Sequence, residues 1–85
     1  MRSIRTADLF YGAYLMCNGA KLKGTLMGGA RMNKVFFEFM GNDKLTRLAI
    51  TYTRGEATVN LRSLKLTLKY LKDMVHEKID QRTLV

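Results

Sequence analysis

Leucine recurs at helical intervals near the end of the chain, and this series constrains the fold more than any other feature. The series consists of Leu61, Leu64, Leu68, Leu71 and Val75. Its spacing of three and four residues places these side chains along one side of an α-helix. Asn60 precedes the series and is a favoured N-cap residue. The pattern therefore predicts a long amphipathic helix over residues 61–79.

The length of the chain decides what this apolar stripe packs against. The 85 residues suffice for one small domain with one modest core. We therefore expect the leucines to face that core, with a dimer seam as the alternative because the spacing lasts for only about two heptads. A membrane face is disfavoured, because the stripe is narrow and lacks Trp and Phe. The expected core contains Leu61, Leu64, Leu68, Leu71, Val35, Phe37, Phe39, Phe10 and Tyr14.

The beginning of the chain predicts a shorter helix over residues 6–18. Four residues recur at helical spacing and would share one face: Phe10, Ala13, Tyr14 and Cys17. Thr6 is the expected N-cap, and Gly19 is the expected left-handed terminator.

Two stretches then alternate between apolar and polar residues in the manner of a β-hairpin, over residues 20–27 and 31–40. The glycine pair Gly28 and Gly29 between them permits a turn with positive φ. The expected inner face carries Leu22, Leu26, Val35, Phe37 and Phe39. The expected outward face carries Lys21, Lys23, Thr25, Met27, Lys34, Phe36 and Glu38.

Residues 43–54 fit two kinds of structure equally well. Leu45, Leu48 and Tyr52 suit a helix opened by Asn42 or Asp43 and closed by Gly55. The run "ITYT" at 50–53 is rich in residues that favour strands. The local pattern does not decide between helix and strand.

Four pieces of the chain, taken in order, resemble a family. They are "TADLFYGAYLMCNG" at 6–19, "VFFEF" at 35–39, "LTRLAITYTRGEATVN" at 45–60 and "LKLTLKYLKDMV" at 64–75. Together they resemble a small domain of unknown function from bacteria, archaea and their viruses. The resemblance implies a helix, a hairpin and two further helices, and so favours a helix over residues 43–54. It carries no established activity and no catalytic residues.

Positive charge indicates the class of partner. The chain has 15 Lys and Arg against seven Asp and Glu, a net charge of +8, which favours binding to polyanions. One group of cations recurs along a single side of the last predicted helix, and no acid lies between residues 57 and 72 to neutralise it. This group comprises Arg62, Lys65, Lys69 and Lys72. Such a stripe is either a phosphate-binding surface or the solvated side of an amphipathic helix.

A second basic group lies on the predicted outward face of the hairpin. Its members are Lys21, Lys23, Arg31 and Lys34, with Phe36 among them. An aromatic ring flanked by lysines on a sheet can stack on a base while the lysines bind the backbone. The alternative is that Phe36 packs under another element or in a dimer interface. Pairing of the hairpin edges between two subunits could extend the sheet.

The inventory of reactive side chains does not favour an enzyme. His76 is the only histidine and Cys17 the only cysteine, too few to build a metal site, and Cys17 is expected to be a buried, inert thiol. Asp73, Glu77 and Asp80 share a helix side that we interpret as solvated. We expect no catalytic residues, no metal and no cofactor. The single cysteine and the polar start of the chain favour a cytoplasmic protein.

These observations predict a small α+β domain, residues 1–85, with the order helix–β-hairpin–helix–helix, a basic arm over residues 1–5 and a frayed tail over residues 80–85. The predicted function is non-catalytic binding of DNA or RNA through backbone charge, with little sequence specificity, by a homodimer of prokaryotic or viral origin. The alternative is a homo-oligomeric interaction protein, such as a viral accessory protein that binds an acidic partner. No membrane partner is expected.

Overall fold

A computed structural model describes residues 2–29 and 34–83 of the chain, with side chains in the last helix described as far as Ile79. Its elements in chain order are β1 (Arg2–Thr6), α1 (Leu9–Cys17), β2 (Lys21–Gly28), β3 (Lys34–Gly41), α2 (Asp43–Thr53) and α3 (Leu61–Thr83). The predicted α+β class is confirmed, and the segment that fitted helix and strand equally well is the helix α2.

The three strands form one antiparallel sheet with β3 in the middle, in the order β1-β3-β2. The strand β1 was not predicted. Ile4 stands opposite Phe39, and Arg5 stands opposite Glu38. The prediction of a basic arm over residues 1–5 is therefore wrong, because Arg2–Thr6 is an edge strand of the sheet.

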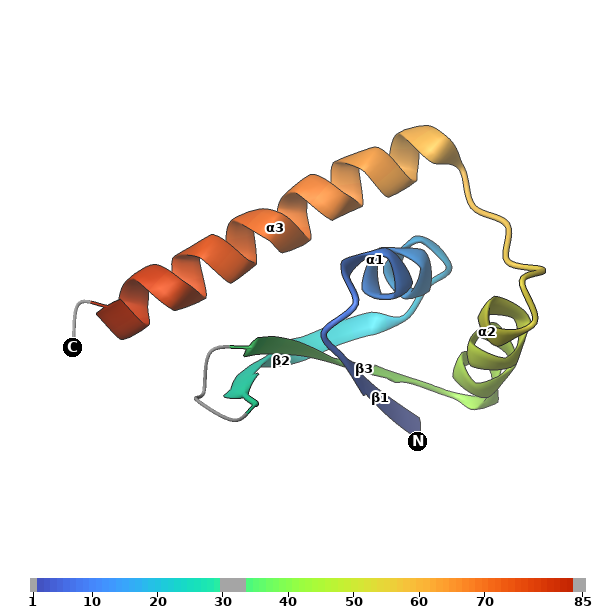
Figure 1. The fold of residues 1–85 in the computed structure, drawn as a ribbon. Helices are drawn as coiled ribbons and strands as arrows, with labels where there is room; N and C mark the ends of the chain where they lie inside the picture. Colours follow the sequence, from blue (N-terminus) through green and yellow to red (C-terminus); the bar gives the residue numbers. More distant parts are fainter. Residues whose placement is uncertain (1, 30–33, 84–85) are drawn as a thin grey trace.

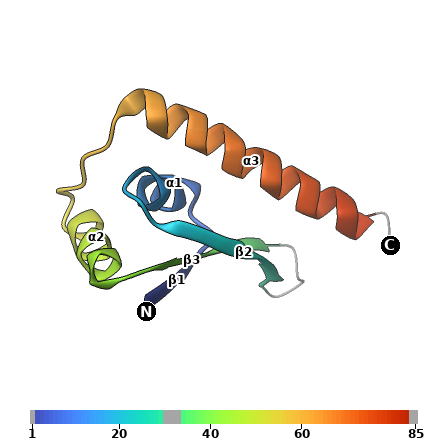
Figure 2. The same cartoon turned by 180° about the vertical axis from the view of Figure 1, so that it is seen from behind.

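The helices α1 and α3 lie on the same face of this sheet. Figures 1 and 2 show α1 between the sheet and α3, with α2 beyond the end of the sheet at which β3 ends. The other face of the sheet, which we call the outer face, is covered by none of the described helices in either view. The fold therefore has three layers, α3, α1 and sheet, and the sheet is open on one side.

Side-chain caps set where the helices begin. Asp8 caps α1, its Oδ1 accepting hydrogen bonds from the backbone N–H groups of Phe10 and Tyr11 at 2.9 and 3.2 Å. Thr6 had been predicted as this cap, but its hydroxyl instead accepts from the N–H of Asp8 at 3.0 Å. The predicted cap Asn60 is confirmed, since its Oδ1 accepts from the N–H of Ser63 at 3.0 Å.

The other helix boundaries also follow local signals. Asn42 caps α2 by accepting from the N–H of Lys44 at 2.9 Å. Gly19 and Gly55 follow α1 and α2 with φ of 100° and 75°, the left-handed conformation that ends many helices. The last helix is four residues longer than predicted, because α3 continues to Thr83. Residues 84–85 of the predicted tail lie outside the described residues.

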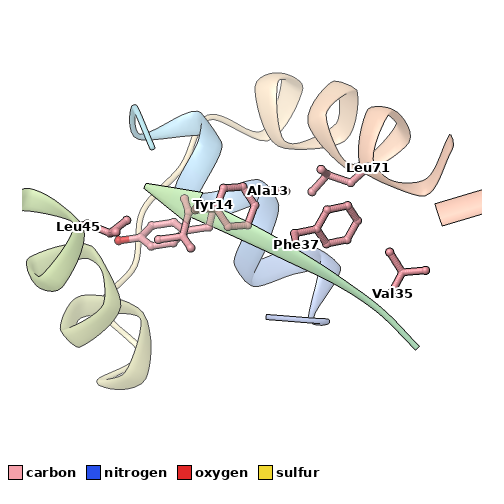
Figure 3. Close-up of a cluster of buried hydrophobic side chains, with 8 residues drawn as sticks. Ala13, Tyr14, Val35, Phe37, Leu45 and Leu71 are labelled. Carbon is pink, nitrogen blue, oxygen red and sulfur yellow. The ribbon is translucent and has the colours of Figure 1, made fainter. Parts of the chain in front are cut away.

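The core gathers where α1, α3 and the inner face of the sheet meet (Figure 3). Its buried members are Ala13, Tyr14, Leu15, Val35, Phe37, Phe39, Leu45 and Leu71. Leu64 and Leu68 are partly buried against them. These positions agree with the predicted inner faces of β3 and of the last helix.

Two predicted core residues lie instead at exposed helix ends. Leu61, the first residue of α3, is 78% exposed, and Phe10, in the first turn of α1, is 60% exposed. The nine residues of α1 span about 14 Å and the 23 residues of α3 about 35 Å, so α1 supports only part of α3. Helical spacing indicates which side of a helix is apolar, but not how much of that side another element covers.

Burial of α1 on two sides explains a core residue that periodicity missed. Four consecutive positions of α1, Gly12 to Leu15, are buried, as expected for a helix held between two layers. A Cβ on Gly12 would lie 3.2 Å from a ring carbon of Phe39 and 3.4 Å from Leu71. Gly12 therefore lets α1 approach both β3 and α3, and Leu15 is buried although it lies outside the predicted apolar face.

A β-bulge in β2 changes which of its side chains face inward. Leu22 pairs with Phe39, but Gly24 pairs with the next residue of β3, Glu38, so Lys23 is an extra residue. Beyond the bulge Leu26 stands opposite Phe36 on the outer face and is 41% exposed, whereas Met27 packs against the core. The predicted directions of Thr25, Leu26 and Met27 are therefore reversed, because one extra residue shifts the two-residue alternation.

Candidate nucleic-acid interface

The predicted cations of the last helix form a continuous exposed row, which we call the α3 stripe: Arg62, Lys65, Lys69 and Lys72. These residues lie about 100° to 180° around the helix from Leu71, the residue that anchors α3 in the core. The stripe is about 15 Å long, from Arg62 to Lys72. All four cations lie on one helix, so helical geometry alone fixes their relative positions.

A shallow groove follows the stripe along α3. It has a volume of about 550 Å³, and the leucines and lysines that line it are Leu61, Leu64, Leu68, Lys65, Lys69 and Lys72. His76 and Asp73 line the same groove further along the helix. One side of α3 thus presents apolar and cationic side chains next to each other.

The ion pairs of the described residues lie away from the stripe. They join Arg2 to Asp43, Arg5 to Glu38, and Lys23 to Glu38. The four cations of the α3 stripe take part in none of these pairs. Their charge is therefore free for an external anion.

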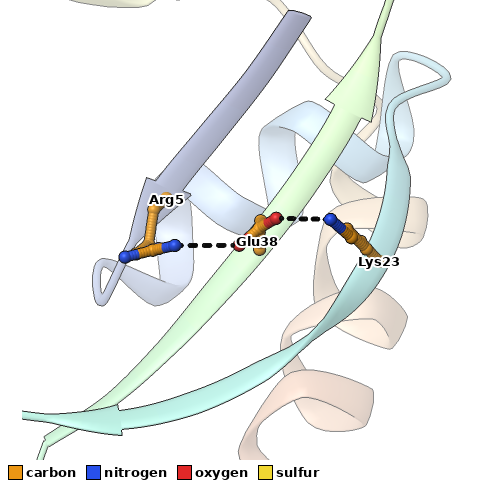
Figure 4. Close-up of polar contacts among 3 residues, drawn as sticks. All are labelled: Arg5, Lys23 and Glu38. Carbon is orange, nitrogen blue, oxygen red and sulfur yellow. Dashed lines mark hydrogen bonds and ion pairs between the residues drawn. The ribbon is translucent and has the colours of Figure 1, made fainter.

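The second predicted basic group occupies the outer face of the sheet. We call this the outer sheet surface: Arg5, Lys21, Lys23, Leu26, Lys34, Phe36 and Glu38. Figure 4 shows Glu38 of the central strand between two cations. Glu38 accepts from Arg5 at 3.1 Å and pairs with Lys23 at 3.2 Å. These hydrogen bonds from Arg5 and Lys23 lower the pKa of Glu38, so its carboxylate neutralises part of the local positive charge.

Phe36 is half-buried on the outer sheet surface, and neither the core nor another described element covers it. An edge of its ring lies over Gly28, where a Cβ would be only 2.8 Å from the ring atom Cε2. Leu26 stands directly opposite Phe36 and adds a second apolar side chain. The pair forms an apolar patch on a surface otherwise lined with cations.

Arg31, a predicted member of this group, falls in residues 30–33, which lie outside the described residues. The other members of the group face outward as predicted. Lys34 and Phe36 alternate along β3 with the buried Val35 and Phe37. Lys21 stands opposite Met40, and Lys23 pairs with Glu38.

The two basic surfaces do not join. The outer sheet surface is on one side of the sheet, whereas α3 lies on the other side, beyond α1 (Figures 1 and 2). A ligand lying along the α3 stripe therefore does not reach Phe36 or its neighbours on the same copy of the chain.

The single thiol and the single imidazole lie apart. Cys17 Sγ is 3.5 Å from Thr67 Oγ1 on α3, and the thiol is half-buried. His76 lies nine residues further along the same helix, about 13 Å from Thr67. Within the part of the chain that is described, no three Cys, His or carboxylate residues form a group suited to a metal ion.

Three of the four tyrosines stabilise the packing of α1 against α2. The ring of Tyr52 lies 4.6 Å from that of Tyr11 and 5.4 Å from that of Tyr14, between centroids. Burial raises the pKa of all three phenols. They are therefore structural, and Tyr70, 53% exposed on α3, is the tyrosine best placed to meet a ligand.

Sequence reasoning missed two members of the outer sheet surface. Arg5 was assigned to a free arm, and Leu26 was assigned to the core. Arg5 joins the surface through pairing of β1 with β3, and Leu26 joins it through the bulge at Lys23. The alternation of Ile4 between Ser3 and Arg5 is the one local signal that indicates a strand there.

Comparisons with protein-family models, with curated proteins and with solved structures found no match to this chain. The resemblance to a small prokaryotic and viral domain family therefore stays a prediction. Among the described residues, no helix combines the length and the apolar character needed to cross a membrane.

Proposed function

We propose that this chain is a non-catalytic nucleic-acid-binding protein whose affinity comes from backbone charge. The observation that carries the proposal is the α3 stripe, four exposed cations free of the ion pairs found among the described residues. Each phosphate that such a cation neutralises releases condensed counterions, which favours binding. We place this activity in the cytoplasm, in keeping with the free thiol of Cys17.

The dimensions of the stripe suit a phosphate backbone. A row of about 15 Å can reach two or three consecutive phosphates of one strand. Lysine binds phosphate as a point charge, and the stripe lacks the Asn, Gln and Arg grouping that reads base edges. We therefore expect binding with little sequence preference.

Salt dependence tests this proposal directly. Binding to arbitrary single-stranded and double-stranded DNA and RNA is measured by gel shift or fluorescence anisotropy from 25 to 200 mM salt, values chosen because counterion release is strong over about this range. We expect log K to fall linearly with log salt. Absence of binding to every probe at the lowest salt would refute the proposal.

A charge-reversal pair locates the site. Lys65→Glu with Lys69→Glu should lower affinity about tenfold or more and reduce the salt slope by about 1.4 to 1.8, the value for two lost phosphate contacts. Lys44→Glu with Arg47→Glu on the exposed side of α2 is the matched control, because it changes the net charge equally. Equal loss in both variants would mean that net charge, and no particular surface, governs binding.

The groove on α3 favours a second candidate function. Leu61 is 78% exposed beside the lysines, an arrangement that suits an amphipathic partner with acidic flanks. This would make the chain an interaction module for an acidic protein or, through the same leucines, for a second copy of itself. Recovery of one stoichiometric acidic protein, together with failure to bind nucleic acid at low salt, would favour this function over the first.

A further inference from the structure

Two separate cationic surfaces face in opposite directions on this small molecule. The α3 stripe and the outer sheet surface are separated by the body of α1 and by the sheet itself (Figures 1 and 2). Leu71 anchors α3 in the core beside β3, and the α3 stripe lies on a side of the helix turned away from Leu71, so the two surfaces are separated by at least the spacing of one packed layer, about 10 Å. No single straight strand can contact both surfaces of one copy.

The outer sheet surface has the chemistry to bind an unpaired strand by itself. It holds four cations and one carboxylate, a net charge of +3. Lys21 and Lys34 lie at opposite ends of β2 and β3, and neither takes part in the ion pairs of the described residues. Between them Phe36 and Leu26 offer an apolar patch on which a base can stack.

We propose that one copy of the chain binds two nucleic-acid segments at once, one along the α3 stripe and an unpaired one across the outer sheet surface. This inference rests on the proposed function. Repulsion between the two bound segments does not prevent it, because the two surfaces are further apart than the Debye length, which is about 8 Å at 0.15 M salt. The protein then acts as a bridge between strands.

A capture assay tests bridging. A biotinylated single-stranded oligonucleotide is fixed on beads, the protein is added and excess is washed away, and a second, fluorescent oligonucleotide of non-complementary sequence is then supplied. The fluorescence retained on the beads reports bridging, and anisotropy with one oligonucleotide reports simple binding. Mass measurement in solution identifies the oligomeric state of each variant.

Three double variants with equal change in net charge separate the surfaces. Lys65→Glu with Lys69→Glu removes the α3 stripe, Lys21→Glu with Lys34→Glu removes the outer sheet surface, and Lys44→Glu with Arg47→Glu is the control. We expect the first two to bind one oligonucleotide and to lose at least about 80% of the bridging signal, as loss of one of two sites requires. The control should bridge like the unchanged protein. Far-ultraviolet circular dichroism checks folding, and if a variant misfolds, glutamine replaces glutamate at the same two positions in that variant and in the control.

The outcomes distinguish the two claims. Failure of the unchanged protein to bind any oligonucleotide overturns the proposed function. Binding of single oligonucleotides without bridging overturns only the inference. Full bridging by either surface variant also overturns it, because a dimer that uses the one remaining surface on each subunit would then hold the two strands.

Discussion

The α3 stripe and the outer sheet surface are built from the same kinds of residue, yet they differ in how much of their charge is free. On α3, the four cations of the stripe take part in none of the ion pairs described. On the sheet, Arg5 and Lys23 share the carboxylate of Glu38 (Figure 4). The same count of cations therefore gives a row outside the described ion pairs in one place and a partly neutralised surface in the other.

The two surfaces also differ in what lies beside their cations. Beside the stripe, Leu71 is fully buried, Leu64 and Leu68 are partly buried against the core, and Leu61 is exposed at the start of the helix. The outer sheet surface has Leu26 and Phe36 on the exposed side of a sheet whose core lies on the other side. Leu71 thus stabilises the fold, whereas Leu26 and Phe36 lie outside the core.

The largest expected effect tests this division of apolar residues. Leu71→Ala should reduce the free energy of unfolding by about 2–5 kcal/mol, because it leaves a cavity between α1, β3 and α3. Leu26→Ala should cost less than about 1 kcal/mol, because that side chain is already 41% exposed. Urea denaturation followed by circular dichroism measures both. A similar loss in the two variants would contradict the distinction between core and ligand-facing residues.

The next effect separates stacking from charge. Phe36→Ala should weaken binding of single-stranded DNA by about 1 kcal/mol, roughly fivefold, without changing the salt slope, because it removes a stacking contact and no cation. Lys69→Ala should instead reduce the salt slope by about 0.7 to 0.9, the value for one phosphate contact. Anisotropy across a salt series measures both quantities. An unchanged affinity in the Phe36 variant would place that residue outside direct contact with the strand.

A smaller effect concerns the shared carboxylate. Glu38→Gln should raise affinity for single-stranded DNA about threefold at low salt, because it frees Arg5 and Lys23 for phosphate. Glu56→Gln, an exposed site in the segment after α2, changes the net charge equally and is the matched control. Equal gains in affinity for single-stranded DNA in the two variants would show that Glu38 does not restrain the sheet cations.

The smallest expected effect is a dependence of stability on pH. Arg5 and Lys23 lower the pKa of Glu38 from its usual 4.5, so the ionised carboxylate stabilises the folded state above that value. This contribution is lost as the pH falls through the lowered pKa. The difference in melting temperature between the unchanged protein and Glu38→Gln should therefore be constant above about pH 5 and shrink under more acidic conditions.

An NMR titration supplies the direct check on that prediction. The Glu38 carboxyl should titrate below 4.5, the usual value from which Arg5 and Lys23 lower its pKa. A Glu38 pKa at or above 4.5 would show that the two cations do not hold the carboxylate in solution.

Features that depend on a single helix could be predicted from the sequence. The α3 stripe, its cap Asn60 and the buried Leu71 all follow from residues within one or two turns of each other. Helical spacing fixes their relative directions whatever the rest of the chain does. The sequence therefore predicts every member of the α3 stripe.

Features that depend on pairing between distant strands could not be predicted in the same way. Arg5 meets Glu38 across 33 residues of sequence, and nothing near Arg5 indicates that partner. The bulge at Lys23 likewise depends on the register between β2 and β3, which local alternation does not encode. The sequence therefore predicts the members of the outer sheet surface only in part. The alternation within β3, in contrast, is enough to predict the inner face of that strand.

The bulge also sets where β2 can change in length. Because Lys23 is the extra residue, its deletion would leave Leu22 opposite Phe39 and Gly24 opposite Glu38, and Leu26 and Met27 would keep their present directions. Only the cation beside Glu38 would be lost. Deletion of Thr25 would instead shift the alternation and turn Leu26 inward. Over evolutionary time, we expect changes of length in this strand to occur at the bulge.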